Sequence, residues 1–158
     1  MITTRTGDDG MTTWKNIRVS KNSNEIHWLG LLDQAMADVC LARIAARQTN
    51  DAQTLGALDK IHAMLNDVCA VLAADAQRDL LPSLTWCDRQ TRGVELDRFV
   101  DFGTTSLTAA QINRARTSVR LAESYLPDAC DDQNPLIRLL LNRISDALFV
   151  LSLNAANT

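Results

Sequence analysis

Apolar residues recur at three- and four-residue steps over most of this chain, and this spacing limits its possible folds more than any other feature. Such a period places the apolar side chains on one face of an α-helix. It runs through four long segments, at about 25–47, 51–75, 107–126 and 136–151. We find no strict alternation of the kind typical of a half-buried strand. The sequence therefore predicts an all-α protein.

Capping residues and prolines indicate where these helices begin and end. Asp51 or the asparagine before it can cap the second segment, and the turn 103–106 can cap the third, which Pro127 closes. Asn134 and Pro135 give the last helix a cap residue followed by a proline at its first position. We therefore expect separate helices joined by short connections.

The segment 77–102 is the least regular part of the chain after the N-terminus. Its Pro82, its Gly93 and its mixed polar content allow a short helix at about 84–92 and a turn near 94–99. Together with the four long segments, this predicts an up-and-down bundle of about five helices. We expect one domain over 1–158, in which 1–24 form an irregular N-terminal arm.

Charge and composition exclude several classes of function. The formal net charge of −3 gives no general attraction for nucleic acid. No apolar run approaches the ~20 residues that a membrane span needs. His27 and His62 show no zinc-ligand or hydrolase-triad spacing. The cysteines form no CxxC pair, so we expect them to be reduced in the cytoplasm; they are Cys40, Cys69, Cys87 and Cys130.

The arm carries the first candidate binding motif, a glycine-containing run from Thr4 to Thr13 followed by Arg18 and Lys21. Glycines let backbone N–H groups approach an anion closely, and the hydroxyl and cationic side chains add donors for a polyphosphate. The run lacks the GK[ST] ending of a Walker loop. An ordinary surface turn is the alternative interpretation.

The helix at 107–126 carries a second candidate. Arg116, Arg120 and Glu123 stand at i, i+4 and i+7, so they share one face and can grip phosphates and a ribose. A solvated face on which Arg120 pairs with Glu123 explains the same pattern.

The last helix carries a third candidate, in which Asn142, Asp146 and Phe149 share one edge beside Arg143 and Ser145. Polar side chains in so apolar a helix need polar partners if they are buried. A ligand, a subunit contact or helix pairing would each provide them.

These motifs occur together in one order, as TRTGDDGMTT, RVSK, GLLDQ, ARTSVRLAES and LNRISDALFVL. In this order the chain resembles the ATP:cob(I)alamin adenosyltransferases of the propanediol-utilisation type. The resemblance implies a five-helix bundle assembled as a homotrimer, with ATP between adjacent subunits. It implies transfer of the 5′-deoxyadenosyl group of ATP to cob(I)alamin, and leaves room for a reductase and an acceptor enzyme as partners.

The resemblance also implies roles for individual residues. Asp33 and Arg116 would form an ion pair across the subunit boundary. Phe99, or else Val100 or Phe102, would belong to the apolar wall that displaces the lower axial ligand of cobalamin. Arg120, Glu123 and Asn142 would complete the nucleotide site from the neighbouring subunit. The arm would wrap the triphosphate and its magnesium ion through Thr4, Arg5, Thr6, Gly7, Thr12, Thr13 and Lys21.

Several residues depart from the pattern of that family. Gln34 follows Asp33 where a glutamate is usual, and Leu121 and Ser124 replace two arginines. Further departures lie at 14–17, where a glycine-containing turn is usual, and at 100–102. Each missing cation removes about 1.5 to 3 kcal/mol of charge-assisted bonding to a polyanion, for which Arg114, Arg138 or Lys15 can compensate.

These departures leave two other functions open. One is a non-catalytic relative that binds ATP or cobalamin as a carrier or regulator. The other is a helical interaction module without a small-molecule site, in which the arm would be a linker.

Overall fold

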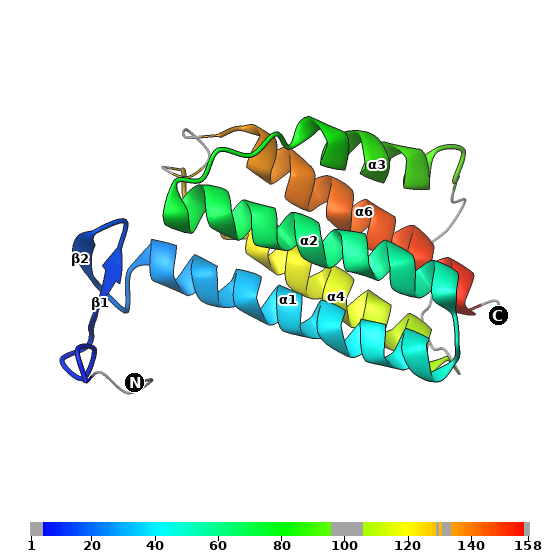
Figure 1. The fold of residues 1–158 in the computed structure, drawn as a ribbon, viewed down its shortest axis with the longest axis horizontal. Coiled ribbons are helices and arrows are strands. Elements are labelled where there is room, and N and C mark those ends of the chain that lie inside the picture. The colour runs from blue at the N-terminus through cyan, green and yellow to red at the C-terminus, as the bar shows by residue number, and fades with distance from the viewer. Residues whose placement is uncertain (1–4, 96–105, 129, 131–133, 157–158) are drawn as a thin grey trace.

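A computed structural model of the chain describes residues 5–95, 106–128, 130 and 134–156. Its long helices are α1 (Asn24–Gln48), α2 (Ala52–Ala74), α4 (Leu107–Ser124) and α6 (Leu136–Ala156), and α3 (Leu81–Thr91) is shorter. Figure 1 shows the long helices side by side, with α3 along the outside of α6. α4 packs against both α1 and α6, and α1 packs against α2. The predicted all-α bundle is confirmed.

The apolar faces of the four long helices meet in one continuous core. Trp28 and Leu32 from α1, Ile61 from α2, Ile112 from α4 and Leu140 from α6 are fully buried there. Each of them falls on the three- and four-residue period of its helix, so burial of these faces determines how the helices are rotated. Among the described residues, no helix is long and apolar enough to cross a membrane.

Side-chain caps fix the beginnings of two helices where the sequence predicted them. The Asp51 carboxylate accepts a hydrogen bond from the Thr54 N–H at 2.9 Å. Hydrogen bonding from Thr54, first through its side chain and then through this N–H, lowers the pKa of that carboxyl. The Ser106 hydroxyl accepts one from the Ala109 N–H at 3.2 Å. α3 begins at Leu81, earlier than predicted, with Pro82 in its first turn, where a missing N–H does no harm. Most of the predicted turn at 94–99 lies outside the described residues.

The arm contains a regular element, so the prediction that 1–24 are irregular was wrong for residues 11–20. Strands β1 (Met11–Trp14) and β2 (Ile17–Ser20) pair antiparallel as a hairpin. The turn residues Lys15 and Asn16 both have positive φ, at 46° and 63°. Two such residues make the tight turn whose twist matches a hairpin, and asparagine tolerates this conformation well.

The hairpin is attached to the end of the bundle through its turn. Trp14 packs against the hydrophobic core. The Lys15 ammonium lies 2.5 Å from a carboxylate oxygen of Asp75, the residue that ends α2 in a left-handed conformation. Figure 1 shows the rest of the arm leaving the bundle beside the start of α1 and pointing away from the helices. The arm therefore has an anchored base and a projecting tip.

Candidate functional site

The tip of the arm, residues 5–10, is a tight loop that Lys21 crosses closely. The Lys21 ammonium donates a hydrogen bond to the Gly7 carbonyl at 2.7 Å, and the Gly10 N–H donates to the same carbonyl at 3.3 Å. A Cβ atom on Gly7 would lie 2.8 Å from the Lys21 nitrogen. A larger residue here would displace the end of the Lys21 side chain, so glycine favours this crossing. An ammonium with two further donors is thus held over the loop.

A second cation closes the loop from the other strand. Arg18 on β2 donates to the Thr6 carbonyl at 2.6 Å and to both carboxylate oxygens of Asp9 at 2.9 Å. The Asp9 carboxylate also accepts from the Met11 N–H. That bond and the Arg18 contact lower the pKa of Asp9. Arg18 is therefore neutralised within the loop, and Arg5 and Lys21 are left as cations facing solvent.

The two threonines of β1 cannot act from the same side of the hairpin. Thr12 is half-buried opposite Val19, and Thr13 is exposed opposite Arg18. Successive residues of a strand point to opposite faces. Of the residues assigned to the arm from the sequence, the structure brings Thr6, Gly7 and Lys21 together and separates the two threonines. Thr4 lies outside the described residues.

The second group of predicted residues lies on the shared outer edge of α4 and α6. The Arg116 guanidinium donates to the Asn113 side chain at 2.8 Å and sits 5.7 Å from the centre of the Phe149 ring. Burial and the nearby charge of Arg120 lower the pKa of Arg116. Two guanidinium groups that repel each other at a half-buried edge favour the arrival of an anion.

Arg120 and Glu123 do not form the ion pair that is expected if this side of α4 is only a solvated, salt-bridged face. In the part of the chain that the structure describes, no ion pair joins them; Arg120 is exposed and Glu123 is half-buried. The Glu123 backbone carbonyl instead accepts from Arg138 on α6 at 3.2 Å. Both side chains remain available to a ligand or a second chain.

Asn142 lies on the same edge, two turns before Phe149 on α6. Its side-chain oxygen accepts from Arg143 at 3.1 Å, and Arg143 is held in turn by Asp88 of α3 at 2.9 Å. This chain of contacts orients the Asn142 amide, whose NH₂ group remains to donate. We call this group the basic edge; it consists of Arg116, Arg120, Glu123, Asn142 and Phe149.

Asp33 and Arg116 do not meet within one chain. Asp33 is exposed on α1, close enough to α2 that its charge adds to the effect of burial in raising the pKa of Cys69. Arg116 faces α6, on the far side of α4. The two residues therefore lie on different faces of the bundle, as an ion pair between two chains requires.

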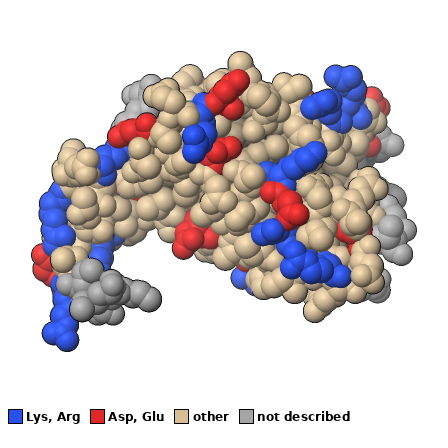
Figure 2. Space-filling model, viewed as in Figure 1, with Lys and Arg blue, Asp and Glu red and all other residues tan. Residues whose placement is uncertain are grey.

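The arm tip and the basic edge are also apart. Figure 1 shows the arm projecting beyond the helices, whereas α4 and α6 run through the body of the bundle. Figure 2 shows Lys and Arg side chains gathered along this projecting arm. One chain thus carries two separate groups of cationic side chains. Phe99, together with Val100 and Phe102, lies outside the described residues.

The three cations proposed to replace the missing arginines all have partners within the chain. Lys15 pairs with Asp75. Arg138 donates to the backbone carbonyls of Glu123 and Leu126, each at 3.2 Å. Arg114 pairs with Asp38 at 2.9 Å. Leu121 and Ser124 themselves are exposed, on the outward side of α4.

Sequence reasoning missed the buried carboxylate of Asp38. It lies on α1 within the apolar face that contacts α4, and only 3 % of its side chain is exposed. The Ser118 hydroxyl donates to it at 2.6 Å. An acidic residue between Ala35 and Ala42 on the buried face was the available signal.

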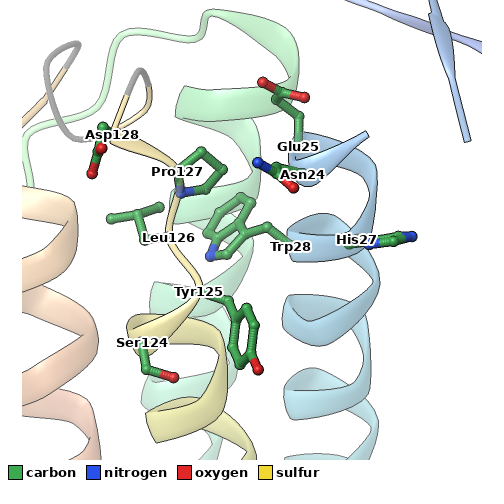
Figure 3. A pocket seen from close by; sticks show the side chains of 9 residues that line it. All are labelled: Asn24, Glu25, His27, Trp28, Ser124, Tyr125, Leu126, Pro127 and Asp128. Atoms are coloured by element: carbon green, nitrogen blue, oxygen red, sulfur yellow. The ribbon is translucent and has the colours of Figure 1, made fainter. Parts of the chain in front are cut away.

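A cavity of about 480 Å³ was also missed, because it is formed by helix ends far apart in the sequence. It lies between the start of α1 and the end of α4, with Glu25, Ser124 and Tyr125 among its lining residues. Figure 3 shows the Trp28 indole pointing from α1 toward the segment that follows α4. Its N–H donates to the Ala122 carbonyl at 2.8 Å. This cavity separates the base of the arm from the last turn of α4.

Comparisons with known proteins identify a family and a fold. The family model for cobalamin adenosyltransferase matches residues 2–155. An arginine-to-lysine variant of a PduO-type ATP:co(I)rrinoid adenosyltransferase from Lactobacillus reuteri, complexed with ATP, has the same fold at a TM-score of 0.82 and 20 % identity. The match covers 98 % of this chain and 94 % of that chain.

A phenylalanine-to-histidine variant of a PduO-type enzyme from the same organism, complexed with cobalamin and ATP, also has a TM-score of 0.82 and 20 % identity. That match covers 96 % of this chain and 89 % of the other. None of the curated proteins matches the sequence.

Proposed function

We propose that this chain, which belongs to the cobalamin adenosyltransferase family, transfers the 5′-deoxyadenosyl group of ATP to cob(I)alamin and releases triphosphate. One observation carries the proposal beyond family membership. The arm tip with Lys21 and the basic edge with Arg120 lie apart in one chain, and each presents an exposed cation. The site is complete when the arm of one chain reaches the basic edge of another.

This arrangement favours a homotrimer. A contact between two different faces of identical chains is heterologous, and it closes into a ring when the rotation allows. On α1, the outward face that carries Asp33 is exposed and partly apolar, with Leu41 and Ile44 exposed by 41 % and 51 %. Packing this face on the basic edge of the next chain would cover both apolar side chains and place Asp33 beside Arg116.

The residues of the arm tip and the basic edge suit the chemistry of the reaction. The cobalt(I) electron pair attacks the C5′ carbon of ATP, the C5′–O bond breaks, and its electrons leave with the triphosphate. Catalysis then consists of positioning the two reactants and stabilising a leaving group of about four negative charges. Lys21, Arg5 and the arm N–H groups would hold the phosphates from one chain, and Arg120 from the next.

A magnesium ion would arrive with the triphosphate. Among the described residues, no three His, Cys, Asp or Glu side chains are grouped so that they could hold a metal. Magnesium usually keeps several waters and binds through substrate phosphates with few protein ligands. The hydroxyl groups of the arm fit that role, and we place the ion there as part of the substrate.

Glu123 and Asn142 would position the nucleoside. A half-buried carboxylate can accept hydrogen bonds from the ribose hydroxyls, and the Asn142 amide can donate to the base or the ribose. Phe99 would belong to the wall that keeps the lower ligand off cobalt and so eases reduction of cobalt(II) by a partner reductase. We place the reaction in the cytoplasm, with an acceptor enzyme taking the product.

The partners of Lys15, Arg114 and Arg138 favour the second candidate function, a relative that binds ATP or cobalamin without turnover. Each of these cations is already engaged by a carboxylate or by backbone carbonyls. None of them then replaces the missing arginines without first giving up its own partner.

An anaerobic assay with chemically reduced cobalamin and ATP distinguishes the two functions. We expect the absorbance change that accompanies adenosylcobalamin formation, at a rate proportional to the enzyme concentration. Binding of ATP by calorimetry without any product at saturating ATP would establish the carrier or regulator instead. Absence of both binding and turnover would leave the interaction module.

A further inference from the structure

A second cavity, of about 420 Å³, lies between α2, α3 and α6, away from the arm and the basic edge. Small residues of α2 make its floor, namely Ala52, Gly56 and Ala57. Gly56 is exposed, and a Cβ atom added to it would meet nothing within 4 Å, so the cavity is open to solvent on this side. Val150 and Leu151 of α6 continue the apolar floor.

The walls of this cavity combine an aromatic ring, a cation and amides. Trp86 of α3 is half-buried, and the Lys60 ammonium lies 5.6 Å from the centre of its ring. Gln53, Gln90 and Asn154 contribute amide groups. None of the described residues that line it is acidic. The chemistry suits a flat aromatic group that is joined to one negative charge and has polar atoms at its edges.

The position of the cavity points to its occupant. It lies where α2 begins and where α3 and α6 end, as Ala52, Gln90 and Asn154 show. A neighbouring cavity of about 370 Å³ lies at the starts of α2 and α4 and the end of α6, where Asp51, Ser106 and Ala155 are among its lining residues. α4 directly follows the segment with Phe99, the proposed cobalamin wall.

We propose that this cavity receives the nucleotide tail of the corrinoid substrate after its base has left cobalt. The inference rests on the proposed function. The tail is a benzimidazole ribonucleotide joined to the corrin ring by a phosphodiester, so it offers a flat base, one negative charge and ribose hydroxyls. The base lies against Trp86, Lys60 swings from the ring to the phosphodiester, and the amides meet the ribose. Holding the tail there prevents the base from returning to cobalt.

Gly56→Leu tests the proposal by filling the cavity from its floor. Leucine is a better helix former than glycine, so the fold is expected to persist. The measurement compares cobalamin with cobinamide, which has the corrin ring but lacks the nucleotide tail. We expect the KM for cobalamin to rise about tenfold, the loss of roughly 1.4 kcal/mol, and the KM for cobinamide to stay unchanged. Gly56→Ala, which fills almost none of the space, is the matched control.

A second measurement uses the free tail, the ribonucleotide of 5,6-dimethylbenzimidazole, with tryptophan fluorescence as the readout. We expect quenching with the wild-type chain, less with Lys60→Gln and none with Trp86→Leu or Gly56→Leu. Adenosine monophosphate serves as the control ligand. Because it should not use this cavity, we expect it to bind Gly56→Ala and Gly56→Leu equally.

The outcomes separate this inference from the proposed function. If the wild-type chain adenosylates both corrinoids and Gly56→Leu changes neither KM, or both alike, the tail does not occupy the cavity. If it adenosylates neither corrinoid, the proposed function fails, and fluorescence then decides the site: no quenching by the tail overturns the inference.

Discussion

Arg114 and Asp38 join α4 to α1 through an ion pair in which only one partner meets water. The Arg114 side chain is 60 % exposed and the Asp38 side chain 3 %, and the atoms Nε and Oδ1 lie 2.9 Å apart. The Ser118 hydroxyl supplies the second hydrogen bond to the carboxylate, at 2.6 Å. The pair therefore matters to Asp38, which has no water to replace its partner.

Loss of Arg114 alone should destabilise the fold more than loss of Asp38 and Ser118 together. Arg114→Ala leaves a buried carboxylate with one hydrogen bond, so we expect the free energy of unfolding to fall by about 1 to 3 kcal/mol. The double variant Asp38→Ala with Ser118→Ala removes both buried polar groups and should cost less than Arg114→Ala. Urea unfolding of the three proteins measures this, and equal losses would contradict it.

Gly7→Ala should weaken ATP use without changing the stability of the bundle. The added methyl would lie 2.8 Å from the Lys21 nitrogen and 3.2 Å from the Met11 carbonyl, so the end of the Lys21 side chain must move and its hydrogen bond to the Gly7 carbonyl is disturbed. We expect a several-fold higher KM for ATP and an unchanged Tm. Gly56→Ala adds the same methyl in open space and should leave the KM for ATP unchanged. An unchanged KM for ATP in Gly7→Ala would show that the loop at the arm tip does not bind ATP.

Arg120→Ala should abolish most activity while the protein stays folded. Arg120 is exposed on the basic edge, so its loss opens no cavity, and one charge-assisted contact to the leaving triphosphate corresponds to roughly 10- to 150-fold in rate. Steady-state kinetics with circular dichroism measures both. Arg47→Ala, which removes another exposed arginine from the end of α1, is the control. Equal activity in Arg120→Ala and Arg47→Ala would show that Arg120 does not contact the nucleotide.

Exchanging the charges of Asp33 and Arg116 tests the association of chains. Asp33→Arg sets two cations against each other at the proposed boundary, and we expect smaller assemblies in sedimentation velocity at low salt. Adding Arg116→Asp restores opposite charges, so larger assemblies should return even though the basic edge is damaged. A monomeric wild-type chain, or an assembly indifferent to both changes, would refute the pairing.

Cys87 should resist thiol reagents until the protein unfolds. Burial raises the pKa of this thiol from 9.0 to about 12. Because the folded pKa exceeds the unfolded one, the stability that comes from keeping the thiol neutral is fully present below about 9 and is lost between 9 and 12. Mass spectrometry after iodoacetamide treatment at pH 8.5 checks this, with denatured protein as the control. Labelling of Cys87 in the folded chain would contradict it.

The helices were predictable because their apolar faces are long and regular. Leu32, Ile61 and Ile144 each fall on a period that several neighbours repeat, so tertiary packing and local pattern agree. The hairpin was missed because its strands have four residues each, too few for an alternation to stand out. The better signal was the pair Lys15 and Asn16, which stands between two short runs that contain β-branched and aromatic residues.

The candidate site was only partly predictable, for a physical reason. Gly7, Lys21 and Arg116 belong to short motifs that their residue types alone single out, and the structure gives each of them a specific contact. The role of Arg18 within the loop and the burial of Asp38 depend on residues 9 to 80 positions away. Contacts of that kind leave no periodic trace in a single sequence.

The projection of the arm away from its own basic edge has a genetic consequence. A chain damaged at Gly7 keeps an intact Arg120, and a chain damaged at Arg120 keeps an intact arm tip. In the proposed ring, built from both kinds of damaged chain, some boundaries would join an intact arm tip to an intact Arg120. Two alleles that are each null alone would then complement one another when expressed together, whereas two alleles affecting the same half would not.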